Sequence, residues 1–310
     1  MKQRDKLIHN APLPIRDGVA PSYLWLQKGE WKTLLEFLTQ RFPDVSAATW
    51  QDRIQRGEVV DDAGTPYSAD SAYRWGGRIF YYREIDAETP IPFEEHILFQ
   101  DQHILVVDKP HFLPVIPTGR FLHETLLVRL KRKHNLPDLS PIHRLDRETA
   151  GVMIFSLNIA SRGAYQFLFQ QRGVTKQYEA LAGDLAGYQA PFIYRSRMVE
   201  GTPFFRMQEQ AGTPNSETHI ERLELLSQTA HPHAIYRYRL HPVTGRKHQL
   251  RVHLSALGIP ILNDDFYPVA LPCKADDMTR PLKLLARSIQ FIDPLSGQER
   301  YFESARQLDC

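Results

Sequence analysis

Pro141-Ile-His-Arg-Leu-Asp-Arg-Glu-Thr-Ala-Gly-Val-Met-Ile-Phe155 is the stretch around which this chain is organised, because a dense group of charges runs directly into an apolar segment. Arg144 and Arg147 flank the carboxylate of Asp146, and Thr149-Ala-Gly151 is typical of a tight turn. The apolar run that follows predicts a strand buried on both faces. A charged turn against a buried strand indicates an active site, and Asp146 is its leading catalytic candidate.

The composition is that of an ordinary soluble globular protein. The chain has 310 residues, 42% of them hydrophobic and 24% charged, and this length usually gives more than one domain. The net charge of +2 by itself favours no partner. Cys273 and Cys310 are too few for a disulfide framework and lack metal-ligand spacing, so a reducing cytoplasm fits best. Without a signal peptide or a stretch of roughly twenty apolar residues, we expect a soluble protein without membrane contact.

Changes in composition divide the chain into three parts: an extended arm over 1–25, a small α/β module over 26–90, and a main domain over 91–310. Within the module, Trp31–Gln40 has the apolar spacing of a helix, and Ser46–Arg56 has a serine N-cap and a glycine after its end. Arg78–Tyr82 is rich in β-forming residues and predicts a strand.

The module resembles the alpha-L RNA-binding motif found in a ribosomal small-subunit protein and in several RNA-modifying enzymes. The match rests on the helix pair, on Ile54-Gln-Arg-Gly57, and on Gly76-Gly77 before a strand. Acids slightly outnumber bases between Glu30 and Glu84, whereas attraction to phosphate supplies most nonspecific affinity for nucleic acids. Direct RNA binding and a purely structural role therefore both stay open for this module.

In the main domain, Ile97–Gln100 and Ile104–Val107 are apolar runs at hairpin spacing, and Ala160–Arg172 predicts a helix. His123–His134 predicts another helix, whose basic end is either a solvated face or a phosphate contact. The bases in that run are Arg129, Lys131, Arg132 and Lys133. The region Tyr194–Phe205 mixes arginines with aromatic rings, a composition that suits either single-stranded RNA or a loop packed on a sheet.

Asp146 has chemical features of a nucleophile. A carboxylate between arginines keeps its ionised form and stays available at neutral pH, although a structural ion pair would have the same spacing. A second cluster, Gly245-Arg-Lys-His-Gln-Leu-Arg-Val-His-Leu254, concentrates five basic side chains beside apolar sequence: Arg246, Lys247, His248, Arg251 and His253. Unpaired buried charge is very costly, so this cluster needs an anionic counterpart, either Asp146 or a bound phosphate.

Other chemistries fit the sequence poorly. His248 and His253 are five positions apart, which is not the four-residue step of a zinc-binding helix, so we predict no metal site. No G-x-S-x-G elbow supports a serine hydrolase. No G-x-x-x-x-G-K-[ST] loop or G-x-G-x-x-G turn supports a nucleotide cofactor, and we predict none.

His143-Arg-Leu-Asp-Arg-Glu-Thr-Ala-Gly151 resembles the HRLD-x-x-TSG signature of the RluA family of RNA pseudouridine synthases. Gly245–His253, together with Pro260-Ile-Leu-Asn-Asp264 and Tyr267, is similar to the second signature of that family. The resemblance covers most of Phe93 to Pro294 in family order. The departures are modest and remove no catalytic group: Ala150, Lys247, Asn263 and Leu285.

The resemblance assigns a role to each matching residue. Asp146 corresponds to the catalytic aspartate, and Arg251 to the basic residue that pairs with it. Arg144 corresponds to the arginine that replaces the flipped-out nucleotide in its stack. Tyr178, within Lys176-x-Tyr-x-Ala180, corresponds to the tyrosine that stacks on the base, and it is a plausible base for the carbon-five proton. Further RNA contacts are expected at His143, Arg246, Lys247 and His248.

The fold that the family implies is α+β, with a mixed, mainly antiparallel central sheet flanked by helices and loops. The implied activity is isomerisation of uridine in structured RNA by a monomer. The expected substrate is ribosomal RNA rather than transfer RNA, or both. Whether Asp146 attacks the ribose or the base is not decided by the sequence. The alternatives are a non-catalytic RNA-binding or ribosome-assembly protein and a metal-dependent hydrolase or nuclease.

Overall fold

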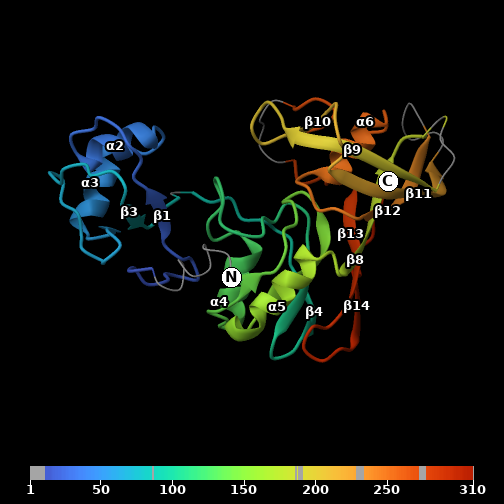
Figure 1. Cartoon of the computed structure of the whole chain (residues 1–310), viewed down its shortest axis with the longest axis horizontal. Coiled ribbons are helices and arrows are strands. Elements are labelled where there is room, and N and C mark those ends of the chain that lie inside the picture. Colours follow the sequence, from blue (N-terminus) through green and yellow to red (C-terminus); the bar gives the residue numbers. More distant parts are fainter. Residues whose placement is uncertain are drawn as a thin grey trace. The chain divides into compact units, whose positions relative to one another are not determined.

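The computed structural model describes residues 11–85, 87–185, 187, 191–227, 234–271 and 277–309 (Figure 1). Both cysteines and the first ten residues of the predicted arm lie outside these ranges. The chain forms two compact units. The first comprises Met1–Thr89, Pro117–Glu124 and Val128–Asn135, and the second comprises Pro90–Ile116, Thr125–Leu127 and Leu136–Cys310.

The first unit is built on a short three-stranded sheet in the order β1-β3-β2. Its elements are β1 (Ser22–Trp25), α2 (Leu34–Arg41), α3 (Ala47–Gln55), β2 (Val59–Val60) and β3 (Arg78–Tyr81). Phe37 and Leu38 of α2 pack with Trp50 and Ile54 of α3 in one apolar cluster. Two helices packed together with the small sheet confirm the helix pair and the strand expected in this part of the chain.

Capping residues explain where these helices begin. The Ser46 hydroxyl accepts a hydrogen bond from the Thr49 N–H at 3.1 Å, which confirms the predicted N-cap of α3. In α2 the N-cap is Thr33, whose hydroxyl accepts from the Glu36 N–H. The Glu36 carboxylate accepts from the Lys32 N–H, so α2 begins later than the sequence pattern predicted.

The helix α4 (Leu126–His134) also begins later than its predicted start at His123. The carboxylate of Glu88 accepts hydrogen bonds from the backbone N–H groups of Leu122, His123 and Glu124 at 2.6–2.9 Å. These three N–H groups therefore bond to a side chain outside the helix. A partner distant in sequence sets this boundary, which is why apolar spacing alone missed it.

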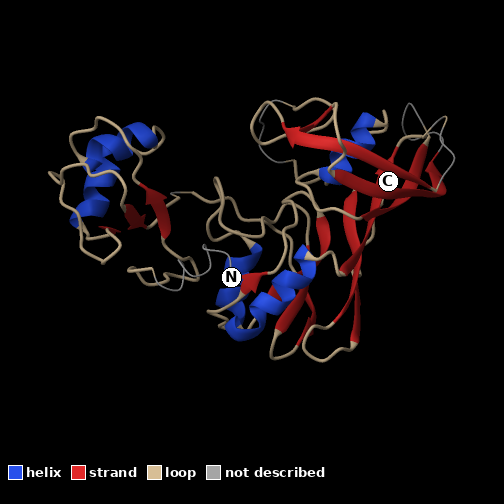
Figure 2. Ribbon diagram, viewed as in Figure 1, coloured by secondary structure: helices blue, strands red, loops and turns tan. Residues whose placement is uncertain are grey.

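The second unit is a large, mainly antiparallel sheet with two further helices (Figure 2). Its main path runs β10-β9-β11-β12-β8-β13-β7-β5-β4, with β14 beside β13 and β6 beside β7. The elements are β4 (His96–Gln100), β5 (Ile104–Lys109), β6 (Ser140–Pro141), β7 (Ala150–Ser156), α5 (Ile159–Gln170), β8 (Val174–Ala182), β9 (Phe192–Glu200), β10 (Met207–Gln210), β11 (Ser216–Ser227), β12 (Ile235–Pro242), α6 (Gln249–Ala256), β13 (Leu284–Ile292) and β14 (Glu299–Glu303). The mixed, mainly antiparallel sheet predicted from the sequence is confirmed.

Strand β7 is the buried strand expected after the charged turn, and all seven of its residues are buried. It pairs antiparallel with β5 and parallel with β13. Tyr165 of α5 packs on the same apolar cluster as Ile104, Val106 and Ile154 of this sheet. The charged turn is thereby attached to a fully buried strand in the interior of the sheet.

The chain has no described helix that is both long enough and apolar enough to cross a membrane.

Gly151 lets β13 approach β7. Its φ is +114°, and an added Cβ would lie 2.2 Å from the Ala286 carbonyl oxygen. Gly151→Ala should lower the free energy of unfolding by about 3 kcal/mol or more, because a strained φ and a backbone collision act together. Gly163 in α5 is the control, since its Cβ would meet nothing within 4 Å. Chemical denaturation of both variants tests this, and equal effects would contradict it.

Candidate active site

Asp146 lies in the turn that leads into β7. Its backbone carbonyl accepts a hydrogen bond from the Thr149 N–H at 3.2 Å, which closes the turn. The carboxylate is 16% exposed and lies 3.6 Å from the guanidinium of Arg144, which is 63% exposed. The Asp146 carboxylate is therefore partly accessible from solvent and has an exposed cation beside it.

Lys109 holds this turn from the interior. Its buried ammonium donates hydrogen bonds to the carbonyl oxygens of Pro110, Leu113 and Arg147 at 2.9–3.0 Å. Burial lowers the Lys109 pKa to about 7, while the charges of Glu148 and then Asp146 oppose that shift. The sequence interpretation assigned no role to Lys109, although a lysine closing an apolar strand was the visible signal.

Arg251 of α6 carries the principal buried charge of the site. Its Nε donates to Oδ2 of Asp264 at 2.8 Å and its Nη2 to Oδ1 at 2.6 Å, and both side chains are almost fully buried. Asp264 also accepts hydrogen bonds from the backbone N–H groups of Phe266 and Tyr267 at 2.8 and 3.2 Å. Arg251 and the loop after α6 are thus fixed together by one carboxylate.

The predicted pairing of Arg251 with Asp146 is present as a longer contact. Nη1 of Arg251 lies 4.0 Å from Oδ2 of Asp146 and 3.4 Å from Oε2 of Glu148. The bidentate partner is Asp264, which belonged to the second signature but had received no role. Three carboxylates therefore surround one guanidinium, and Asp146 makes the longest contact with it.

His248 approaches Asp146 from the start of α6. Its Nδ1 lies 2.9 Å from the Tyr267 hydroxyl, which already accepts a hydrogen bond from the Met207 N–H. The hydroxyl can therefore donate to Nδ1, leaving the ring hydrogen on Nε2, 3.9 Å from Oδ2 of Asp146. Burial lowers the His248 pKa to about 4, so at neutral pH this contact involves a neutral imidazole.

Tyr178 lies on β8, which pairs with β13 beside β7. It is half-buried and packs against an apolar cluster of the sheet. Burial, followed by the negative charge of Asp146, raises its pKa above the usual value for a phenol. Tyr178 is therefore protonated at neutral pH and can donate a hydrogen bond.

A buried polar network fixes α6 on the sheet. The ring nitrogens of His253 lie 2.9 Å from the hydroxyls of Thr218 and Ser216. The Gln249 amide donates to the Thr218 hydroxyl and the Glu217 carbonyl oxygen, each at 2.9 Å. These contacts give His253 a structural position and hold His248 and Arg251 in place on the same helix.

The other predicted RNA contacts have different surroundings. Arg246 is exposed, and its Nε donates to the Asn215 carbonyl oxygen at 3.2 Å, while Lys247 is half-buried. His143 stacks on Phe169 with ring centroids 4.7 Å apart, and its Nε2 accepts from the Ile154 N–H. This placement favours a structural role for His143, whose RNA contact stays a prediction.

The basic run at the end of α4 belongs to the first unit. Arg129 pairs with Glu124, whereas Arg132 and Lys133 are exposed. Lys131 is half-buried on the same helix. The phosphate contacts expected of these bases stay a prediction.

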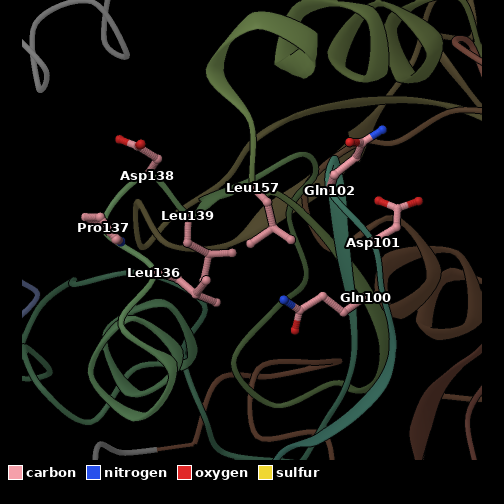
Figure 3. Close-up of a pocket in the computed structure, with 8 residues that line it drawn as sticks. All are labelled: Gln100, Asp101, Gln102, Leu136, Pro137, Asp138, Leu139 and Leu157. Atoms are coloured by element: carbon pink, nitrogen blue, oxygen red, sulfur yellow. The ribbon is translucent and has the colours of Figure 1, made fainter.

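A separate hollow of about 270 Å³ lies between the β4–β5 turn and the segment after α4 (Figure 3). Leucines and the acids Asp101 and Asp138 line it, and no predicted site residue does. Its lining includes carboxylates but no lysine or arginine, so it does not suit a phosphate backbone. Among the described residues, no group of three or more His, Cys, Asp or Glu side chains is arranged to hold a metal ion.

Comparison with known proteins defines the class. The family model for RNA pseudouridylate synthase matches residues 103–256. The solved structure of human RNA Pseudouridylate Synthase Domain Containing 1 matches with a TM-score of 0.55 and 25% identity, covering 69% of this chain and 84% of that one. Asp146 and the elements from β5 to α6 therefore lie in the part of the chain that matches an RNA pseudouridylate synthase domain.

Relatives in sequence define the family. Dual-specificity RNA pseudouridine synthase RluA of Haemophilus influenzae is 31% identical over 226 residues, which cover 71% of this chain and 97% of the relative. Pseudouridylate synthase RPUSD2 of Mus musculus is 35% identical over 182 residues, or 58% of this chain, and the match spans 32% of the mouse protein. This chain belongs to the RluA family of RNA pseudouridine synthases.

Asp264→Asn should strongly destabilise the protein. It removes the bidentate charge partner of a buried guanidinium, and breaking such a pair costs about 3 kcal/mol or more. Asp184→Asn is the control, because Asp184 pairs with Arg222 where both side chains are exposed, and such pairs are worth at most about 1 kcal/mol. Denaturant unfolding measures both, and a loss at Asp264 no larger than at Asp184 would contradict the assigned role of the pair.

Acid should destabilise the protein well before the carboxylates titrate. Burial is the first cause that lowers the pKa of four histidines to about 4: His111, His143, His248 and His253. Between about pH 6.5 and 4 the unfolded chain binds more protons than the folded one. The contribution of these neutral histidines to the free energy of unfolding is therefore fully present above pH 6.5 and is lost as the pH falls toward 4.

Urea unfolding at a series of pH values between 7 and 5 measures this loss. His253→Gln should flatten the slope, whereas His96→Gln, at an exposed position on β4, should leave it unchanged. A stability that stays constant from pH 7 to 5 would show that these histidines are not held neutral by the fold.

Proposed function

We propose that this chain converts uridine to pseudouridine in structured RNA, with Asp146 as the nucleophile and without a cofactor. The proposed substrate is ribosomal RNA rather than transfer RNA, or both. The observation that carries the proposal is the position of the Asp146 carboxylate. It is open to substrate, and it lies 4.0 Å from a buried guanidinium whose closest bonds go to Asp264. Membership of the RluA family supports the same chemistry.

The surroundings of Asp146 suit a nucleophile. Arg251 lies 4.0 Å from Asp146 but makes its close hydrogen bonds to Asp264, which leaves the lone pairs of Asp146 available. In the reaction the bond between the ribose and ring nitrogen one breaks and the base turns. A bond from the ribose to carbon five then forms, the proton on carbon five leaves, and ring nitrogen one takes up a proton from water. Attack of Asp146 on the ribose or on the ring is compatible with this geometry.

Arg144 is suited to replace the flipped nucleotide. Its guanidinium is the exposed member of the site, and its long side chain keeps only a 3.6 Å contact with Asp146. Extracting a nucleotide from a stack leaves a gap that a planar cation can fill. We propose that Arg144 enters the RNA while Asp146 meets the extruded uridine.

Tyr178 is proposed to stack on the base. Because its raised pKa keeps the hydroxyl protonated, removal of the carbon-five proton by Tyr178 requires its own proton to pass to an acceptor at the same time. Asp146 is the charged group whose field acts on this phenol. Tyr178 is therefore proposed to pass its hydroxyl proton to the Asp146 carboxylate as it takes the proton from carbon five, and Asp146 then releases that proton to water.

The remaining RNA contacts are proposed on the strength of charge. Arg246 and Lys247 precede α6 and lie next in sequence to His248. The bases near the end of α4 are proposed to contact phosphate groups of the RNA. A cytoplasmic location and a monomeric state complete the proposal.

Asp146→Asn should abolish pseudouridine formation while leaving RNA binding intact, because the amide keeps the shape of the carboxylate but is a poor nucleophile. Pseudouridines are mapped in total RNA from cells that lack the gene and carry either the wild type or this variant. Asp184→Asn, a matched change at an exposed aspartate, should restore every site that the wild type restores. Restoration by Asp146→Asn would contradict the mechanism, and a map independent of the gene would favour a non-catalytic RNA-binding protein.

A further inference from the structure

Phe204 has an unusually exposed aromatic ring in the second unit, with 86% of its surface accessible. It lies in the turn between β9 and β10, within the aromatic and basic region that the sequence analysis left open. A single exposed apolar side chain is common and needs no explanation. Two further features set Phe204 apart: the rigidity of its turn and its connection to the site.

The turn is closed by several hydrogen bonds. The Gly201 N–H donates to the Arg206 carbonyl oxygen at 3.1 Å, and the Arg206 N–H donates to Pro203 at 2.9 Å. The Arg206 guanidinium reaches the Pro268 carbonyl oxygen at 2.7 Å. The backbone that carries Phe204 is thus held by hydrogen bonds, so little backbone entropy remains to be lost when a ligand binds the ring.

A series of ring contacts leads from Phe204 to Asp146. The centroid distances are 5.7 Å from Phe204 to Phe205, 5.1 Å from Phe205 to Phe266, and 5.7 Å from Phe266 to His248. His248 in turn lies 3.9 Å from Asp146. Phe204 is therefore the solvent-facing end of an aromatic wall whose inner end borders the candidate nucleophile.

We propose that Phe204 is a stacking platform for an unpaired RNA base close to the uridine that reacts at Asp146, an inference that rests on the proposed function. Extruding a nucleotide unstacks its neighbours, and an exposed π-face next to the site restores part of the lost stacking. Stacking accepts any base, so Phe204 contributes to affinity without selecting the sequence.

A second copy of the chain fits this surface less well. One phenylalanine ring contributes about 150–250 Å², whereas a stable protein interface buries about 800 Å² on each partner. Val269 and Leu271, which follow Pro268 in the chain, are also exposed, but they are aliphatic and offer no ring. A single RNA base, in contrast, is large enough to cover one phenylalanine ring.

Binding is tested with the full chain and a uridine-rich single-stranded RNA of about twelve nucleotides, in which 2-aminopurine replaces one position at a time. The wild type should quench the fluorescence at one or two adjacent positions, because stacking on an aromatic ring quenches the probe. Phe204→Ala should abolish that quenching and weaken binding about tenfold, the value of one stacked base. Phe204→Trp should keep both properties, and Phe204→Leu should behave as the alanine variant because it lacks a π-face.

Activity on unmodified total RNA from cells lacking the gene gives the second measurement. Phe204→Ala should raise KM about tenfold and change kcat by less than about twofold. Tyr301→Ala is the matched control, an exposed aromatic residue on β14 at the opposite end of the second unit from β10 (Figure 1). It should leave KM unchanged.

The outcomes separate this inference from the proposed function. If the wild type forms pseudouridine but Phe204→Ala keeps its KM and its quenching, the stacking platform is refuted while the function stands. A leucine variant that equals the wild type, or a wild type that dimerises through this patch, also refutes it. A wild type that forms no pseudouridine overturns the proposed function instead.

Discussion

The guanidinium of Arg251 is the charge on which the geometry of the candidate site depends. Removing an arginine from water is costly, and the fold offsets that cost with carboxylates at increasing distances: 2.6 Å to Asp264, 3.4 Å to Glu148 and 4.0 Å to Asp146. The closest carboxylate fixes the guanidinium and the loop after α6. The most distant one, Asp146, makes no close bond to this guanidinium and keeps its lone pairs, as the proposed nucleophile requires.

The sheet places that charge beside the turn of Asp146. Strand β13 approaches β7 closely enough to exclude a side chain at Gly151, and β8 pairs with β13 and carries Tyr178. Buried Lys109 ties the turn to the end of β5. Burial keeps His248 neutral and Tyr178 protonated at neutral pH.

Local patterns in the sequence were sufficient for elements whose signals are local. Local patterns predicted the N-cap at Ser46 and the buried strand β7, whereas the mainly antiparallel sheet was an expectation from the family resemblance. The start of α4 was not predicted, because Glu88 binds the preceding N–H groups from a distant position. Likewise, the charge cluster after Gly245 predicted an anionic counterpart but not that Asp264 would be the closest one. Which of several carboxylates pairs with a buried cation depends on tertiary distances that no spacing encodes.

The most direct measurement is release of the carbon-five hydrogen from RNA labelled with tritium at carbon five of uridine, using the purified full chain. Carbon five loses this hydrogen when it becomes bonded to the ribose, so every turnover releases one tritium to water. The account predicts release equal to the pseudouridine formed. If the wild-type chain binds this RNA but releases no tritium, the result contradicts the account.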